Sequence, residues 1–282
     1  MYDVNFLLAN GVDVNKSLEL FGDMDTYNQS VGEFIVSAEE KRARLSKAKN
    51  DKDMSSYANY THSLNSDASY FGFTKLAEMA KTQEEKAKSG DVLYIFDHCQ
   101  ELIVEMEKSI NIIKQYISGA SAETAPAPAT PAPAATPQAA PAQVTYDSAD
   151  AYLEKTILVV DDSSIVRNFV KRIFSETYNI GAAENGVEAI NIIKSNMGND
   201  NIMAILLDLN MPKVSGFAVL DFMKENNLFS KMPVSIISGD SSKDTIDKAF
   251  TYPIVDMLGK PFKEGDVKSV IEKTIYLKGT NS

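Results

Sequence analysis

The sequence predicts an all-α four-helix bundle joined by a disordered linker to an α/β domain with a parallel sheet. Apolar residues recur with a helical period up to residue 118, and a run of Ala and Pro follows. From about residue 155, short apolar runs alternate with amphipathic segments. The chain has 282 residues, enough for two domains with separate cores. We place the bundle in residues 1–118, the linker in 119–150 and the α/β domain in 151–282.

The bundle is predicted from amphipathic segments separated by stop and start signals. The expected helices span 19–49, 53–69, 74–89 and 91–118. Asp53 is a candidate N-cap, and Gly90 is a candidate stop. In the last helix, apolar residues are spaced alternately by four and three, which is typical of a helix that packs one stripe into a bundle. This stripe consists of Val92, Phe96, Cys99, Ile103, Met106, Ile110, Ile113 and Ile117.

The linker is predicted from its composition. Residues 120–143 are almost wholly Ala, Pro and Thr. Such a segment buries too little apolar surface to offset its ordering entropy, and its prolines favour extended polyproline II stretches. We therefore expect a disordered, semi-rigid tether.

The α/β domain is predicted from five strand and helix pairs. The strands are expected at 156–160, 178–182, 202–207, 233–237 and 254–258. The helices are expected at 163–175, 186–196, 216–226, 242–250 and 263–276. Repeated units of this length predict a parallel sheet covered on both faces, with ligands at the carboxyl ends of the strands.

Composition excludes several function classes. The net charge is −11, and both halves of the chain are acidic, so no direct binding of nucleic acid is expected. The N-terminus lacks the features of a signal peptide, and no apolar run approaches the ~20 residues that span a bilayer. We expect a cytoplasmic protein without membrane insertion.

Charged and polar residues follow four of the predicted strands. They are Asp161 and Asp162, Asp208, Ser238 and Lys260. Parallel strands bring their carboxyl ends to one edge, so these side chains should meet. Carboxylate oxygens are preferred ligands of Mg²⁺, and clustered acids repel one another unless a cation intervenes. The pattern predicts a site for Mg²⁺ and an oxyanion, suited to phosphoryl chemistry at Asp208.

The motifs around these residues are ILVVDDS, LLDLNMPKVSG, SIISGD and LGKPF. In this order and spacing they resemble the receiver domains of bacterial response regulators, over about residues 155–279. The resemblance implies a flavodoxin-like (βα)5 fold and makes Asp208 the phosphoacceptor. Lys260 and Ser238 would then stabilise the transferred group. The implied Mg²⁺ ligands are Asp161, Asp162, Asp208 and the Asn210 carbonyl.

Two features qualify this resemblance. Met257 stands where the family usually has an aromatic switch residue, so the output face is undetermined. Asn210 and Asp240 occupy positions where polar residues assist attack by water, which implies a short-lived aspartyl phosphate and weak autophosphatase activity.

His62 is the candidate site of the bundle. It lies on a helix face shared with small residues, which predicts an accessible imidazole. The segment YTHSLNSDASYFGFTKL around it resembles the pattern of histidine-containing phosphotransfer (HPt) domains, over about residues 10–118. The matching positions are His62, Leu64, Ser66, Ala68, Gly72 and Leu76. The resemblance implies that His62 is a phosphoacceptor, although Asn65 replaces the usual lysine three residues later.

Together these patterns predict a phosphorelay protein that carries phosphoryl groups on His62 and Asp208. The chain has no Gly-rich nucleotide loop, so it is expected to be a carrier and not an enzyme that draws phosphate from ATP. The donor would be a separate histidine kinase or a small phosphodonor, and other receiver or HPt proteins are the expected partners. The alternatives are a non-catalytic docking scaffold and a phosphate sink for a kinase. Transfer within one chain or between chains is left open.

Overall fold

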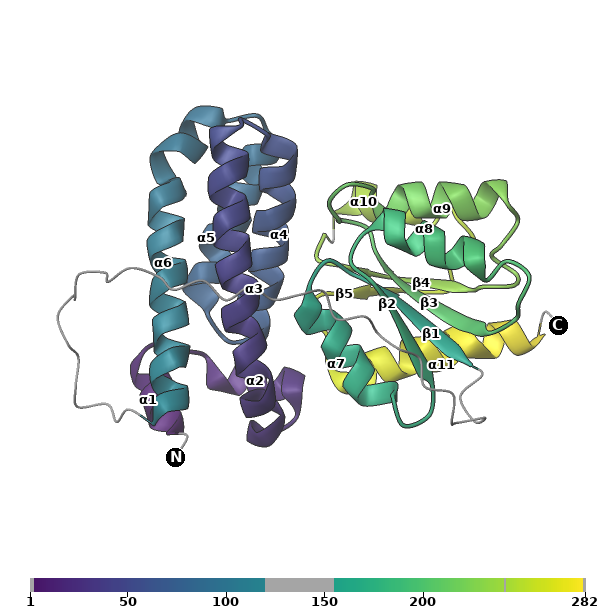
Figure 1. Cartoon of the computed structure of the whole chain (residues 1–282), viewed down its shortest axis with the longest axis horizontal. Helices are drawn as coiled ribbons and strands as arrows, with labels where there is room; N and C mark the ends of the chain where they lie inside the picture. Colours follow the sequence, from purple (N-terminus) through teal and green to yellow (C-terminus); the bar gives the residue numbers. More distant parts are fainter. Residues whose placement is uncertain (1–2, 120–154, 241, 281–282) are drawn as a thin grey trace, which may run out of the picture.

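The computed structural model describes residues 3–119, 155–240 and 242–280. It places a helical bundle beside an α/β domain (Figure 1). The predicted linker lies outside the described residues except for Gly119, so its predicted limits and disorder stay predictions. Within the described ranges, no helix is long and apolar enough to cross a membrane.

Four long helices form the bundle, as predicted, and two short helices precede them (Figure 1). They are α1 (Val4–Ala9), α2 (Val14–Phe21), α3 (Met24–Asn50), α4 (Met54–Tyr70), α5 (Thr74–Lys88) and α6 (Val92–Ser118). The Asp53 carboxylate accepts the Ser56 backbone N–H and caps α4, as predicted. Gly90 has a φ of 76° just beyond α5, which is the left-handed conformation that glycine tolerates best.

Two details of the bundle prediction were wrong. The expected helix at 19–49 is broken at Gly22, whose φ is 88°, because the Asp23 carboxylate caps α3 separately. In α6, Phe96 is 41% exposed and Ile117 is 43% exposed, although both belong to the predicted apolar stripe. Steps of four and three average 3.5 residues, so a straight helix of 3.6 residues per turn drifts away from such a stripe.

The α/β domain has five strands. They are β1 (Thr156–Val160), β2 (Asn179–Ala183), β3 (Ile202–Asp208), β4 (Val234–Ser238) and β5 (Met257–Gly259). The order is β2-β1-β3-β4-β5, and every pairing is parallel. The fifth strand was predicted at 254–258. Val255 already donates its backbone N–H to Val234, but the regular ladder starts only at Met257.

Helices cover both faces of this sheet (Figure 1). They are α7 (Ser164–Phe174), α8 (Gly186–Ser195), α9 (Gly216–Glu225), α10 (Lys243–Ala249) and α11 (Glu264–Thr280). α7 and α11 lie on one face, and α8, α9 and α10 lie on the other. The arrangement confirms a flavodoxin-like (βα)5 fold. The strand order reverses between β1 and β3, which is where such sheets place their ligand sites.

Candidate functional site

The carboxyl ends of β1 and β3 bring together the acidic residues predicted from the sequence. One oxygen from each of Asp161, Asp162 and Asp208 lies within 4.8 Å of the others. Asp161 and Asp208 are fully buried. The Lys260 Nζ lies 2.6 Å from Oδ2 of both Asp161 and Asp208. The site is therefore a compact cluster of three carboxylates and one ammonium.

Lys260 is held in place by the neighbouring strand. Its backbone N–H donates to the Ser238 carbonyl at 2.8 Å, and the following peptide to Pro261 is cis. Ser238 is 2% exposed, and its Oγ accepts the Asp240 backbone N–H at 3.1 Å. The ends of β4 and β5 thus bring the hydroxyl and the ammonium to the same edge as the carboxylates.

The charges in this cluster shift one another's pKa values. Burial, together with the nearby charges of Asp208 and Asp162, raises the pKa of Asp161 to about 7 against the attraction of Lys260. Burial alone would lower the pKa of Lys260, but the carboxylates of Asp161 and Asp208 raise it above its ordinary value. Lys260 therefore stays an ammonium, and the excess of negative charge favours a further cation.

The remaining predicted residues lie around this cluster. The Asn210 backbone N–H donates to Asp208 Oδ1 at 3.1 Å, and its buried Nδ2 has no hydrogen-bond partner among the described residues. Asp240 accepts the Ser242 backbone N–H at 2.9 Å, so its carboxylate is engaged at the start of α10. Met257 is partly buried and packs against the apolar core.

His62 faces this cluster from α4 of the bundle. The predicted accessibility of its imidazole was wrong, because the side chain is only 3% exposed. A Cβ built on Gly239, the residue after β4, would lie 2.7 Å from Cε1 and 3.0 Å from Nε2 of His62. The α/β domain therefore covers the histidine, and glycine permits the close approach. Helical periodicity describes one helix and cannot show that a second domain covers it.

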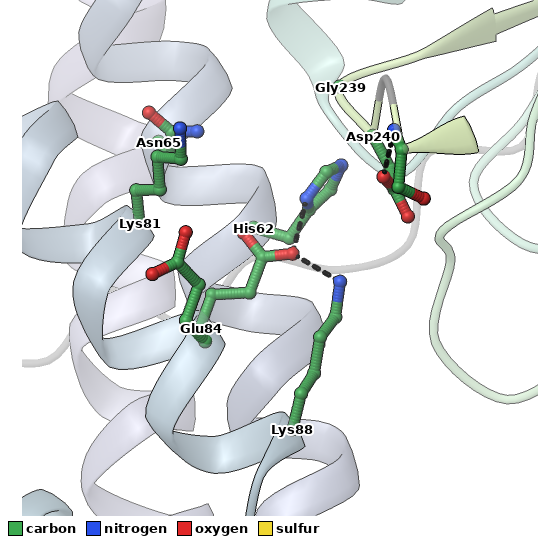
Figure 2. Close-up of a pocket in the computed structure, with 9 residues that line it drawn as sticks. His62, Asn65, Lys81, Glu84, Lys88, Gly239 and Asp240 are labelled. Atoms are coloured by element: carbon green, nitrogen blue, oxygen red, sulfur yellow. Dashed lines mark hydrogen bonds and ion pairs between the residues drawn. The ribbon is translucent and has the colours of Figure 1, made fainter. Parts of the chain in front are cut away.

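Glu84 on α5 is a functional candidate that sequence reasoning missed. Its Oε1 lies 2.9 Å from His62 Nδ1 and accepts a hydrogen bond of 2.6 Å from Lys88 Nζ (Figure 2). The Glu84–Lys88 spacing of four residues was visible in the sequence. That spacing is common on solvated helices, so only the packing of α5 against α4 identifies this pair.

The contact with Glu84 determines which ring nitrogen is free. Burial alone would lower the pKa of His62, but Glu84 and Asp208 raise it above its ordinary value. Burial alone would raise the pKa of Glu84, yet His62 and Lys88 lower it, so this group is a carboxylate. A singly protonated ring therefore keeps its proton on Nδ1. Its Nε2 is buried, faces Gly239 and has no hydrogen-bond partner among the described residues.

A cavity of about 260 Å³ opens beside His62, between the two domains (Figure 2). It is lined by His62, Asn65, Lys81, Glu84, Glu85, Lys88, Gly239, Asp240 and Ser242. Asn65 brings no charge to this cavity, but Lys81 and Lys88 reach it from α5. The positively charged side chains that line this cavity therefore come from α5 and not from the position three residues after His62.

Comparisons with known proteins agree with both halves of this description. The family model of the response regulator receiver domain matches residues 157–272, and that of the Hpt domain matches residues 29–117. Two-component response regulator ORR11 of Oryza sativa subsp. indica is 28% identical over 120 residues, which is 42% of this chain and 80% of the relative. Two-component response regulator ORR3 of the same subspecies is 28% identical over 123 residues, which is 43% of this chain and 92% of the relative.

Among solved structures, a response regulator receiver domain protein from Clostridium thermocellum is similar to this chain, with 26% identity and a TM-score of 0.41. The match covers 45% of this chain and 99% of that protein. The two family models match separate segments, each containing one of the two candidate sites. The chain therefore joins an Hpt domain to a receiver domain and belongs to the two-component phosphorelay proteins.

Proposed function

We propose that this phosphorelay protein carries phosphoryl groups on Asp208 and on His62. The observation that carries the proposal is the buried Asp208 carboxylate with the Lys260 ammonium 2.6 Å away. The donor is a separate histidine kinase or a small phosphodonor, and the other partners are receiver or HPt proteins. The chain acts as a carrier, with at most weak autophosphatase activity.

At Asp208 the reaction is a nucleophilic displacement. A carboxylate oxygen of Asp208 attacks the phosphorus of the donor, and the bond to the leaving group breaks with its electron pair. Negative charge on the transferred group is offset by the Lys260 ammonium, and Ser238 donates a hydrogen bond from its hydroxyl. These groups are held by the strand ends before the donor arrives, so little reorganisation is needed.

The three carboxylates fit Mg²⁺, because hard oxygen ligands lie close enough together to share one ion. We assign its protein ligands to Asp161, Asp162, Asp208 and the Asn210 carbonyl. When bound, Mg²⁺ neutralises charge on the phosphoryl oxygens. Its binding also offsets the mutual repulsion of the acids.

Mg²⁺ is therefore expected to stabilise the folded chain. At a tenfold excess over its dissociation constant, the gain in unfolding free energy is about 1.4 kcal/mol. Thermal unfolding with and without Mg²⁺ measures it. The Asp162→Asn variant should lose most of the gain, whereas Asp200→Asn, at an exposed position outside the cluster, should keep it. An equal Mg²⁺ effect in both variants would contradict the ligand assignment.

Labelling with a small phosphodonor tests the proposed function. In the presence of Mg²⁺, the chain should gain a base-labile phosphoryl group at Asp208, and Asp208→Ala should abolish that gain. The His62→Gln variant should still be labelled at Asp208 and should lack acid-labile phosphohistidine. Absence of any modification would instead support the docking scaffold, and base-labile label that persists in Asp208→Ala would refute the assignment of the acceptor.

A further inference from the structure

The two domains of this chain meet through an aromatic contact. Phe21 and Tyr70 of the bundle pack against Phe169 on α7, each with 6.1 Å between ring centroids. Tyr70 also packs against Phe262 at 6.0 Å, and its hydroxyl accepts the Phe262 backbone N–H at 3.3 Å. All four rings are at most 2% exposed. The contact is therefore buried like a domain core and unlike a transient, solvated interface.

A buried carboxylate lies within the same contact. Asp67 on α4 is 1% exposed, and its Oδ2 lies 2.5 Å from both Lys41 Nζ and Ser37 Oγ within the bundle. Its other oxygen, Oδ1, accepts a hydrogen bond of 2.6 Å from Ser163 Oγ of the α/β domain. A buried carboxylate oxygen without a partner is costly, so a receiver lacking this hydroxyl would dock less well. The buried Asp67 carboxylate thus favours a receiver domain that has a hydroxyl at the position of Ser163.

A third contact lies on the last turn of α7. Arg172 Nη1 donates to Ser30 Oγ of the bundle at 2.9 Å, and its guanidinium lies 5.9 Å from the Phe21 ring centroid. Burial lowers the pKa of Arg172, and attraction to Glu33 on α3 opposes that effect. Arg172 and Glu33 therefore carry opposite charges that attract each other across the two domains, outside the cluster around Asp208.

We infer that the bundle face around His62 is a docking surface for the receiver domain of the same chain, so that Asp208 and His62 exchange a phosphoryl group within one molecule. The exchange rests on the proposed function, whereas the docking does not. Residues 120–154 connect the two domains. A covalent connection of this kind raises the effective concentration of one domain for the other toward the millimolar range. The aromatic contact, the Asp67–Ser163 hydrogen bond and the contacts of Arg172 then favour the receiver domain of the same chain over other receivers.

The transfer balances without a further reactant. The lone pair on His62 Nε2 attacks the phosphorus, the bond from phosphorus to the Asp208 oxygen breaks, and its electron pair returns to the carboxylate. Nδ1 keeps its proton, so the phosphorylated ring carries a positive charge beside the Glu84 carboxylate. The reverse reaction uses the same atoms. Because docking buries His62, it also limits competing attack by water.

Docking is tested by the reactivity of the two histidines toward diethylpyrocarbonate in the full chain. His98 is partly exposed and serves as the internal reference. We expect His62 to react at least tenfold more slowly than His98. Arg172→Glu should remove this protection, and adding Glu33→Arg should restore it. The matched control is Lys171→Glu, the same charge change at an exposed position on the same helix. Equal reactivity of the two histidines in the unaltered chain would overturn the docking surface.

Transfer within one molecule is tested by kinetics. The rate at which label moves from Asp208 to His62 should stay constant over a hundredfold dilution of the full chain. Arg172→Glu should slow this movement at least tenfold, while Lys171→Glu should leave it unchanged. A rate proportional to protein concentration would overturn the inference. So would equally fast transfer in a mixture of His62→Gln and Asp208→Ala chains.

The two sets of measurements separate the inference from the proposed function. If Asp208 accepts no label, the proposed function fails, yet protection of His62 from diethylpyrocarbonate still reports docking. If Asp208 is labelled and His62 is unprotected, the function stands and the docking surface fails.

Discussion

Replacement of Lys260 with alanine is expected to slow phosphorylation of Asp208 by about a hundredfold or more. The ammonium lies 2.6 Å from the Asp208 carboxylate and is the positive charge that the structure places at the reacting oxygen. Removal of one preorganised stabilising group from a buried site typically costs a factor of 10²–10³ in rate. The measurement is the initial rate of labelling by a small phosphodonor at saturating Mg²⁺.

The control for this prediction is Lys268→Ala, which removes an exposed lysine paired with Glu264 on α11. It should be labelled at the normal rate. Loss of Lys260 also leaves three carboxylates without their ammonium, so the variant should depend more strongly on Mg²⁺ for thermal stability than the unaltered chain. This second readout separates a lost catalytic charge from general unfolding. A Lys260→Ala chain labelled at the normal rate would refute the proposed role.

The acidic site was predictable from the sequence because each of its residues follows a short apolar segment that can be recognised as a strand. Asp161 and Asp208 each follow a buried apolar run, and parallel strands bring such ends to one edge. Lys260 and Ser238 follow by the same reasoning. The five strands needed only one substantial shift, at β5, where the apolar run begins before the regular pairing. Short-range patterns therefore specify both the receiver fold and its candidate site.

The contact between the domains was not predictable in this way. Ser163 donates to Asp67 across 96 positions in the sequence. Ser163 also caps α7, which by itself accounts for a serine at that position. Gly239 lies close to His62 only because the two domains meet there. No periodicity links residues in separate domains, so the burial of His62 and the role of Asp67 appear only in the folded chain.

Glu84→Ala is expected to slow transfer from Asp208 to His62 by about ten- to a hundredfold. Glu84 holds the proton on Nδ1, so its loss permits the tautomer in which Nε2 is protonated and cannot attack. It also leaves the positive ring of phosphohistidine without a countercharge. Glu84→Gln keeps an acceptor for Nδ1–H and should retain part of the rate. Glu78→Ala, at an exposed position on α5, is the control and should transfer normally.

The pH dependence distinguishes this role of Glu84 from a merely structural one. Only the neutral ring attacks, so transfer to His62 should become faster as pH rises through the His62 pKa. Glu84 and Asp208 raise that pKa above its ordinary value, while burial lowers it. Removal of Glu84 leaves burial less opposed, so the His62 pKa falls and the rise in rate moves to lower pH. A Glu84→Ala chain with an unshifted profile would mean that Glu84 does not control the protonation of His62.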